Sequence, residues 1–363
     1  MIGEPARSAR VGAGVPFRGE REFVRWLCRR WPDRAPGLEL GIGDDAAVVS
    51  TRPGIDLVLT TDLSLEGVHF QVGLHPPASI GHRALARSLS DLAAMGARPK
   101  FALLSLAIPR HTPRRWIAAF YDGMGALAKR VEVKLIGGDT AVAADGPIVV
   151  DMIAAGEVKH GQALTRAGAR PGDRIYVTGR LGLSALGLDL LKSRARAIPV
   201  CAPAGRQPRS SEAAALAAHL YPEPRCQAGI DLVKHGLASA AIDVSDGFAR
   251  DLGRLCDSSD CGALVWEDRL PVPQPPARAR ASSGPRLGPS LDPVECALLG
   301  GEDYELLFTV PRGKGPQVPS VLGGAGLREV GEVRRGRGLR LVRRDGREVR
   351  LAARGYDHFR SLS

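Results

Sequence analysis

The spacing of apolar positions predicts helices and strands that alternate along the first half of the chain. Helical spacing, or Ala- and Leu-rich runs that stop at Gly or Pro, predicts helices over residues 20–31, 78–95 and 113–130. Short apolar runs predict strands over residues 56–61, 101–108, 134–136 and 147–158. Residues 1–17 precede these elements and are predicted to form a flexible, basic extension.

A second pattern of the same kind begins after residue 165. It predicts strands over residues 174–177, 240–242 and 305–310, and helices over residues 185–191 and 247–255. Interleaved strands and helices in both halves predict an α/β or α+β fold with two domains, residues 18–165 and 166–363. The stretches 192–211 and 271–292 are rich in Pro, Arg, Ser and Ala, and are predicted to be surface insertions.

Composition narrows the class of protein. Of the 363 residues, 44% are hydrophobic, which suits a chain that buries a sizeable core. The six cysteines form no Cys-x-x-Cys pair, so neither a zinc knuckle nor a redox dithiol is indicated. No apolar run is long enough for a membrane span, and the N-terminus lacks the apolar region of a secretory signal. We therefore expect a cytoplasmic protein.

The net charge of +11 leaves two interpretations open. A basic protein can bind nucleic acid, so one alternative is a nucleic-acid-binding protein without catalysis. Against this alternative, the arginines are scattered, and aromatic residues make up only 5% of the chain, so no base-stacking platform is evident. We favour a solvated basic surface that steers a polyanionic substrate toward its site, with neither nucleic acid nor membrane as a partner.

Five segments, spread over more than 250 positions, place an acidic residue beside Gly or another small residue. They are Gly41–Asp45, Thr60–Asp62, Gly137–Thr140, Ile242–Gly247 and Gly300–Tyr304. Any one of them alone is most simply an Asp-Gly turn. Repetition of the pattern favours a site where carboxylates bind magnesium and glycines let the backbone approach phosphates.

The carboxylates of these segments follow several predicted strands, and side chains from different elements can converge there. Converging carboxylates repel one another and are stable mainly with a metal ion present. Because magnesium uses a few carboxylates together with substrate phosphates, the pattern indicates ATP as a ligand. For Asp91, on the predicted helix over residues 78–95, a polar helix position and a metal ligand are equally good interpretations.

Other phosphate-binding and catalytic signatures are absent from the sequence. It contains no P-loop, no protein-kinase signature set and no Gly-x-Ser-x-Gly elbow. Gly323–Gly326 is glycine-rich but lacks a strand-loop-helix context, and is predicted to be a turn. Among the histidines, His69 follows an acidic segment and is a candidate substrate contact. Covalent catalysis is not indicated.

Taken in order, nine segments resemble the thiamine-monophosphate kinase family, within the superfamily typified by aminoimidazole ribonucleotide synthase. They are Gly41–Ala47, Thr61–Asp62 with Glu66–Phe70, Leu89–Ala97, Gly137–Thr140, Ala163–Arg166, Gly168–Asp173, Ile242–Gly247, Gly300–Leu306 and Gly355–Phe359. The resemblance implies phosphorylation of thiamine monophosphate to thiamine diphosphate, with ATP as co-substrate and several Mg²⁺ ions. It also implies a homodimer whose N-terminal sheets pair across the interface, with a C-terminal α/β domain beside them.

The resemblance further implies roles for residues at matching positions. Magnesium ligands match Asp45, Thr60, Thr61, Asp62, Asp91, Asp139, Asp243 and Asp246. Nucleotide contacts match Tyr121, Gly138, Asp139, Arg166 and Ser245. Thiamine-phosphate contacts match His69, Glu302 and Tyr356.

The implied reaction requires no general base. The nucleophile is a phosphate oxygen of thiamine monophosphate, which is mostly deprotonated at neutral pH because its second pKa is about 6. The remaining task is to align two polyanions in line, and metal ions and cationic side chains screen their repulsion. We expect direct in-line transfer without a phosphoenzyme, with Asp62 and Asp139 essential as metal ligands.

Three relatives within the superfamily are alternatives. Aminoimidazole ribonucleotide synthase shares the ATP site, but segments Glu66–Phe70 and Gly355–Phe359 favour the thiamine family. Selenophosphate synthetase needs a reactive Cys or selenocysteine near its N-terminus, whereas the first cysteine here is Cys28, inside a predicted helix. The hydrogenase-maturation relative ends in a cysteine tail, whereas this chain ends in Ser361-Leu-Ser363.

Overall fold

The computed structural model describes residues 22, 25, 38–40, 43–143, 146–193, 210–273 and 292–356. The predicted basic extension (1–17) lies outside these residues, as does most of the two predicted insertions (192–211 and 271–292). Of the helix predicted over residues 20–31, Glu22 and Arg25 are described, and both are helical.

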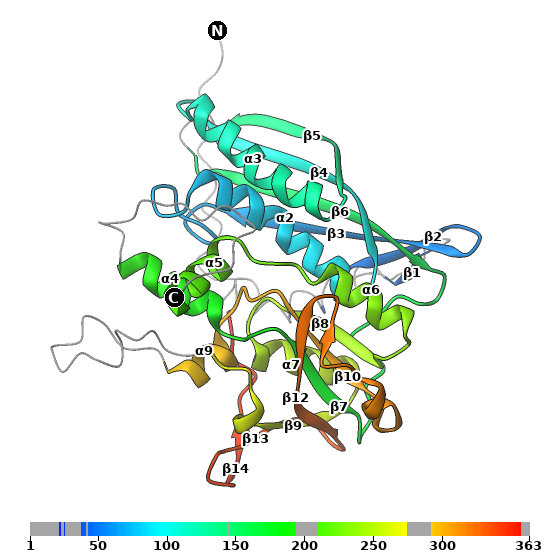
Figure 1. Cartoon of the computed structure of the whole chain (residues 1–363). Helices are drawn as coiled ribbons and strands as arrows, with labels where there is room; N and C mark the ends of the chain where they lie inside the picture. Colours follow the sequence, from blue (N-terminus) through cyan, green and yellow to red (C-terminus); the bar gives the residue numbers. More distant parts are fainter. Residues whose placement is uncertain are drawn as a thin grey trace, which may run out of the picture.

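The N-terminal half is a six-stranded sheet with two helices on one face (Figure 1). The strand order is β1-β2-β3-β6-β4-β5, and all pairs are antiparallel except β4 with β5. The strands span Leu38–Leu40 (β1), Ala47–Arg52 (β2), Ile55–Leu65 (β3), Arg98–Pro109 (β4), Lys134–Ala143 (β5) and Val149–Lys159 (β6). The helices span Pro77–Ala94 (α2) and Arg114–Arg130 (α3).

Side chains alternate between the two faces of this sheet because successive residues of a strand point in opposite directions. In β3, Val58 and Ser64 are buried on the side of α2, whereas Thr61 and Leu63 are exposed on the opposite side. In β4, Phe101 is also exposed. We call this opposite side the open face, since no helix of the described residues covers it.

The C-terminal half is built on a second, mixed sheet in the order β14-β13-β9-β12-β7-β10-β8, with β11 paired to β12. Its strands span Arg174–Thr178 (β7), Ala240–Val244 (β8), Gly262–Trp266 (β9), Glu305–Val310 (β10), Val321–Leu322 (β11), Ala325–Arg334 (β12), Gly338–Val342 (β13) and Glu348–Leu351 (β14). Its α-helices span Leu183–Ser193 (α4), Ser211–Leu220 (α5), Cys226–Lys234 (α6), Phe248–Ser258 (α7) and Pro293–Leu299 (α9). Two 3-10 helices span Glu267–Arg269 (η1) and Arg312–Gln317 (η2).

Helix α2 packs between the two sheets. Most of its residues are buried, and Leu89 shares one hydrophobic core with Val150 of β6 and Phe308 of β10. Polar residues of α2 that point away from this core, such as Arg87 and Asp91, line a cavity at the junction between the two halves.

Helix α3 approaches α2 closely because two glycines lie at their contact. A Cβ atom at Gly81 would lie 2.0 Å from the carbonyl oxygen of Phe120, and one at Gly123 would lie 1.9 Å from that of Ala78. Only glycine permits such an approach of two backbones. The contact holds α2 in a defined position against the sheet, together with the side chains it presents to the junction.

Every strand and helix predicted within the described residues is present, but three predicted strand ends are wrong. β3 continues past Asp62, β5 continues past Asp139, and β8 includes Asp243. Each extension is paired with a neighbouring strand, for example Asp139 with Ser105 and Asp243 with Leu306, so ladder hydrogen bonds keep these residues extended. These aspartates therefore lie within strands and not in loops after them.

Several further features agree with or extend the predictions. Both halves mix strands and helices, as predicted, while the proposed division near residue 165 falls between β6 and β7 and stays a prediction. Gly323 and Gly324 form the predicted turn, which joins β11 to β12. None of the helices in the described part of the chain is both long and apolar enough to cross a membrane.

Candidate active site

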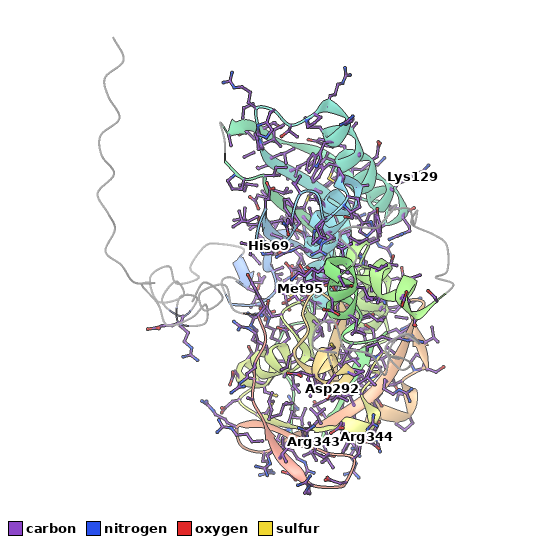
Figure 2. All side chains as sticks on the ribbon, turned by 90° about the vertical axis from the view of Figure 1, so that its left-hand side faces the viewer. His69, Met95, Lys129, Asp292, Arg343 and Arg344 are labelled. Atoms are coloured by element: carbon purple, nitrogen blue, oxygen red, sulfur yellow. The ribbon has the colours of Figure 1, made fainter. Side chains whose placement is uncertain are left out.

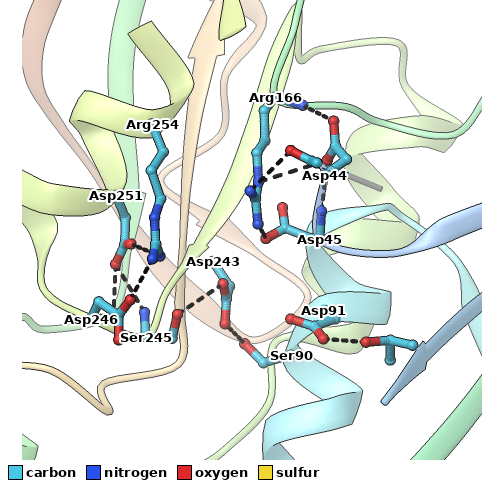
Figure 3. Close-up of polar contacts among 12 residues, drawn as sticks. Asp44, Asp45, Ser90, Asp91, Arg166, Asp243, Ser245, Asp246, Asp251 and Arg254 are labelled. Atoms are coloured by element: carbon cyan, nitrogen blue, oxygen red, sulfur yellow. Dashed lines mark hydrogen bonds and ion pairs between the residues drawn. The ribbon is translucent and has the colours of Figure 1, made fainter. Parts of the chain in front are cut away.

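Three carboxylates from distant parts of the sequence meet near the end of α2 (Figure 3). Ligand oxygens of Asp45, Asp91 and Asp243 lie within 4.8 Å of one another. Asp45 precedes β2, Asp91 lies in the last turn of α2, and Asp243 lies in β8. The cluster thus offers oxygen ligands from three separate elements to one divalent cation.

Hydroxyl groups orient two of these carboxylates. Thr60 Oγ1 donates a hydrogen bond to Asp91 Oδ2 at 2.5 Å, and Ser90 Oγ donates one to Asp243 Oδ2 at 2.7 Å. Ser90 and Asp91 are consecutive residues of α2, so the helix that supplies one ligand also positions another. The cluster is therefore held in a fixed geometry by its surroundings.

Burial and mutual repulsion make this cluster unfavourable without a cation. Burial raises the pKa of Asp91 well above its usual value, and the charges of Asp62, Asp243 and Asp45 raise it further. Burial and then Asp45 likewise raise the pKa of Asp243 well above its usual value. In the described part of the chain, Asp45 Oδ2 and Asp62 Oδ2 are buried and accept no hydrogen bond. Oxygen-seeking Mg²⁺ would satisfy these atoms and relieve the repulsion, so the residues present fit such an ion.

Arg166 contacts the cluster from the segment between β6 and β7. Its guanidinium pairs with Asp45, and its backbone N–H donates to Asp44 Oδ2 at 3.1 Å. Burial lowers the pKa of Arg166, but Asp45 and Asp44 raise it by more, so the net shift is upward. A fixed cation thus stands beside the carboxylates, at a position suited to a phosphate group. Its predicted contact with ATP stays a prediction.

A buried carboxylate shapes the loop that follows β8 (Figure 3). Asp251 Oδ2 accepts hydrogen bonds from the backbone N–H groups of the three residues from Ser245 to Gly247, at 3.0–3.1 Å. Burial raises the pKa of Asp251 to about 7. Arg254 bridges Asp251 and Asp246, with N–O distances of 3.0 and 2.7 Å. These bonds hold the loop with its predicted ligands next to the carboxylate cluster.

A cavity of about 350 Å³ opens beside the cluster. Predicted metal ligands, nucleotide contacts and thiamine-phosphate contacts all contribute to its lining. They are Asp62, His69, Asp91, Asp243, Ser245, Asp246, Glu302 and Tyr356. Figure 2 shows His69 at mid-height of the molecule, between the N-terminal sheet and the C-terminal half. Residues predicted to contact metal, nucleotide and thiamine phosphate therefore share one space.

Glu302 lines this cavity from a strained turn before β10. Glu302 and Tyr304 have φ angles of 63° and 51°, in the left-handed region that non-glycine residues rarely adopt. Arg83 donates to Glu302 Oε2 at 2.5 Å. Burial raises the pKa of Glu302, but Arg83, His219 and Arg87 lower it by more, to about 2. Glu302 is therefore ionised at neutral pH and suited to contact a cationic ligand group.

Two predicted metal ligands lie on the open face of the N-terminal sheet, away from the cavity. Thr61 Oγ1 donates to Asp151 Oδ1 at 2.6 Å, and Asp139 lies opposite Ser105 on the edge strand β5. The period of two in a strand explains why Thr60 faces the cluster while its neighbour Thr61 does not. The structure of one chain thus does not bring Thr61 or Asp139 to the carboxylate cluster.

Two predicted nucleotide contacts are also not among the residues that line the cavity within one chain. Gly138 adjoins Asp139 on β5, and a Cβ atom there would lie 1.9 Å from the carbonyl oxygen of Leu104 on β4. Tyr121 lies on α3, with its ring edge-on to that of Phe120 at 5.6 Å between centroids. The roles predicted for Gly138 and Tyr121 stay predictions.

Helix α2 contributes two cations that the sequence analysis did not single out. Arg83, Arg87 and Asp91 lie on successive turns and share one side of the helix. Arg83 contacts Glu302 and the backbone oxygen of His69, while Arg87 pairs with Asp62 Oδ1 at 3.5 Å. The signal that could have found them is this spacing of charged residues in a helix otherwise rich in Ala and Leu.

This chain matches both family models and individual known proteins. The family model for the AIR synthase related protein N-terminal domain matches residues 43–158, and that for the C-terminal domain matches residues 170–344. The thiamine-monophosphate kinase of Salmonella typhimurium (strain LT2) is 39% identical over 328 residues, which is 89% of this chain and 92% of that protein. The chain belongs to the thiamine-monophosphate kinase family.

Two further relatives support this membership of the thiamine-monophosphate kinase family. The enzyme of Bacillus subtilis (strain 168) is 35% identical over 329 residues, covering 89% of this chain and 94% of the relative. A solved structure described as AaThiL complexed with AMPPCP and TMP is 30% identical, covers 94% of this chain and 97% of that one, and superposes with a TM-score of 0.75. The resemblance and the two-domain α/β fold class are thereby confirmed, and a non-catalytic nucleic-acid-binding protein is set aside.

Proposed function

We propose that this protein transfers the γ-phosphoryl group of ATP to thiamine monophosphate, releasing thiamine diphosphate and ADP, with several Mg²⁺ ions bound. The observation that carries the proposal is the convergence of Asp45, Asp91 and Asp243 beside a cavity lined by Glu302, in a chain of the thiamine-monophosphate kinase family. The AMPPCP and TMP complex of a relative supports both co-substrates.

The proposed metal ligands are the eight residues implied by the family resemblance. They are Asp45, Thr60, Thr61, Asp62, Asp91, Asp139, Asp243 and Asp246. When bound, the ions supply positive charge to the phosphate oxygens. The uncompensated buried oxygens of Asp45 and Asp62 support this part of the proposal.

The proposed substrate contacts fall into two groups, one for each substrate. We propose that Tyr121, Gly138, Asp139, Arg166 and Ser245 contact ATP. We propose that His69, Glu302 and Tyr356 contact thiamine monophosphate, whose thiazolium ring is cationic. The ionised carboxylate of Glu302 supports this assignment, because it complements a positive ring.

The proposed transfer proceeds directly and in line. An oxygen of the acceptor phosphate attacks the γ-phosphorus, while the bond from that phosphorus to the β–γ bridging oxygen breaks and ADP leaves with the electron pair. No proton moves, because the acceptor phosphate is mostly a dianion at neutral pH. Trapping of a phosphorylated Asp or His during turnover would overturn the direct transfer.

We propose further that two copies of the chain pair through the open face of the N-terminal sheet. Leu63 and Phe101 on this face have exposed fractions of 48% and 44%, and Ile136 on the adjoining edge strand β5 has 57%. An exposed apolar surface of this kind is typical of a protein–protein interface. Asp139 and Asp62 are three strand spacings apart, about 14 Å. We therefore propose that Asp139 of one protomer serves the metal site of the other.

A mixed dimer tests this shared site. Asp139→Asn and Asp243→Asn are each expected to lose most turnover as pure proteins. In a mixed dimer purified through two different affinity tags, one of the two sites carries both substitutions and the other carries neither. We expect about half the wild-type turnover per dimer. A mixed dimer as inactive as its parents would show that Asp139 does not act across the interface.

We also propose a cytoplasmic location and no nucleic-acid partner. Cys226, Cys256, Cys261 and Cys296 are buried free thiols, as expected in a reducing compartment. Basic side chains are spread over the surface, with Lys129 near one end of the molecule and Arg343 and Arg344 at the other (Figure 2). This distribution supports a solvated basic surface.

Release of ADP by the purified protein tests the proposed function. With ATP and Mg²⁺, we expect ADP formation only when thiamine monophosphate is added, with thiamine diphosphate as the second product. ADP formation without thiamine monophosphate, or no stimulation by it, would contradict the proposal. The substrate of aminoimidazole ribonucleotide synthase would then be the next acceptor to assay.

A further inference from the structure

Arg87 is a buried cation at the cavity whose hydrogen-bonding capacity is not used up. It lies on α2 and lines the cavity, with 14% of its side chain exposed. Its guanidinium lies 3.5 Å from Asp62 Oδ1, a long ion pair. Its Nε atom is buried and has no hydrogen-bond partner among the described residues. A guanidinium carries several N–H donors, so Arg87 can bind an additional acceptor.

Two other arginines near Arg87 already bond to protein groups, namely Arg254, which also lines the cavity, and Arg83 on α2. Arg254 bonds to Asp246 and Asp251, and Arg83, one turn before Arg87, bonds to Glu302 and to backbone oxygens. Among the residues that line the cavity, five are carboxylates and two are arginines. An incoming phosphate therefore meets one cation on α2 that lines the cavity and whose donors are not all engaged.

Arg87 lies on α2 one turn after Arg83, which bonds to Glu302, and one turn before Asp91 of the carboxylate cluster. Arg87 therefore lies between the two functional ends of the cavity. Asp62 belongs to the proposed metal site, and Glu302 to the proposed thiamine contacts. A molecule whose cationic ring lies at Glu302 and whose phosphate points toward the metal site would carry that phosphate past Arg87.

We propose that Arg87 binds the phosphate group of thiamine monophosphate and thereby selects the phosphorylated acceptor over thiamine. This inference rests on the proposed function and deepens it. Arginine suits the role because its planar fork matches two phosphate oxygens at once. Binding there reduces the repulsion between the acceptor phosphate and the γ-phosphate, and it holds the attacking oxygen near the metal site. Arg87 is then a substrate-contacting catalytic residue, and Asp62 is the protein group that it pairs with.

Calorimetric titration with thiamine monophosphate and with thiamine, each in the presence of Mg²⁺ and a non-hydrolysable ATP analogue, tests the inference. In the wild-type protein we expect thiamine monophosphate to bind at least about tenfold more tightly than thiamine, on the scale of one charged hydrogen-bonded contact. In Arg87→Gln this ratio should fall to about one, while the affinity for thiamine stays within about twofold. Arg87→Lys should be intermediate, since lysine keeps the charge but lacks the fork.

Steady-state kinetics supply a second readout and a control. We expect Arg87→Gln to raise the KM for thiamine monophosphate by about tenfold or more and to leave the KM for ATP within about twofold. Arg115→Gln removes an exposed arginine of α3 and should change neither constant. If Arg87→Gln does not fold, the Arg87→Lys variant carries the same comparison.

The outcomes separate this inference from the proposed function. If the wild-type protein binds no thiamine monophosphate, the proposed function fails and the inference fails with it. If the wild-type protein prefers thiamine monophosphate and Arg87→Gln keeps that preference, the inference alone is overturned. A rise in the Mg²⁺ requirement without a change in the preference for the phosphorylated acceptor would also overturn it, because Arg87 would then only balance the charge of Asp62.

Discussion

The two faces of the N-terminal sheet carry acidic residues under opposite conditions. On the face toward α2, Asp62 lies near Asp91, which converges with Asp45 and Asp243 at buried or half-buried positions. On the open face, Asp139 is exposed on an edge strand, next to exposed apolar residues such as Phe101. Aspartates on the face toward α2 are therefore buried close to one another and repel, whereas the aspartate on the open face is solvated.

This difference between the two faces supports a different binding partner for each of them. The cluster beside α2 combines burial with repulsion, and some of its oxygens have no protein donor, which supports the proposed Mg²⁺ site. Among the described residues, the open face carries no buried uncompensated charge of this kind but exposes apolar surface, which supports the proposed pairing with a second chain. If both are supplied in the dimer, Asp139 and Asp62 act in one site although one chain keeps them apart.

The largest expected effect comes from the face toward α2. Asp62→Asn should fold but lose turnover by about 100-fold or more, the scale of removing one preorganised electrostatic group. Turnover at saturating substrates measures the loss, and circular dichroism verifies the fold. Asp268→Asn removes an exposed carboxylate and should keep full activity. Near-normal activity of Asp62→Asn would remove Asp62 from the proposed ligands.

A smaller effect is expected from the open face. Phe101→Asp places a charge in the proposed interface, so we expect a dimer to become a monomer in analytical ultracentrifugation. Turnover should fall about tenfold or more, because the protomers no longer share Asp139. Val321→Asp, at a 54% exposed apolar residue of β11, should remain dimeric and active. A fully active monomer of Phe101→Asp would contradict the shared site.

The smallest expected effect concerns Asp303, a carboxylate that is buried but lies outside the cluster of converging carboxylates. Asp303 accepts hydrogen bonds from the backbone N–H groups of Gly182 and Ser184 at 2.6 and 3.2 Å, and burial raises its pKa to about 8. Folded Asp303 therefore keeps its proton at pH values where an unfolded aspartate, with a pKa of about 4, has lost it. The stability that it contributes is present at low pH and is lost as the pH rises from about 4 to about 8.

Urea unfolding of Asp303→Asn at pH 5 and pH 8, without Mg²⁺, measures this contribution. Relative to the variant, the wild-type free energy of unfolding should decrease between pH 5 and pH 8 by about 1 kcal/mol or more. Mg²⁺ should stabilise the variant as much as the wild type, because Asp303 is outside the carboxylate cluster. Identical pH dependence in both proteins would show that burial of Asp303 does not perturb its titration.

Many individual residues of the site could be predicted from the sequence. The acidic segments contain Asp45, Asp62 and Asp243, and the helix that carries Asp91 was predicted from its Ala- and Leu-rich run. Their distances were not predictable, because four elements from both halves of the chain must pack before these carboxylates meet. For Asp91, the structure favours the ligand interpretation over the polar helix position, since its carboxylate converges with Asp45 and Asp243.

Other features escaped the sequence for specific physical reasons. Thr60 and Thr61 have the same side chain, and only the pairing of β3 determines which of them faces the cluster. Arg87 has the local sequence of an ordinary helix cation, and only burial beside Asp62 makes it a candidate phosphate ligand. The strands predicted over residues 56–61 and 134–136 end too early, because pairing with neighbouring strands overrides the local turn preference of Asp and Gly.

By itself, the sequence predicted many of the elements through hydrophobic periodicity, although not, for example, β2, β12 and α6, and it indicated the kind of chemistry through repeated acidic and glycine segments. Each of these patterns depends on residues that are close in the sequence, so it can be recognised without the folded structure. Only the tertiary structure decided which aspartates converge, which face each side chain takes, and which arginine has donors left for a substrate. Those properties depend on burial and on the distances between segments far apart in the chain, and both arise only when α2 packs between the two sheets.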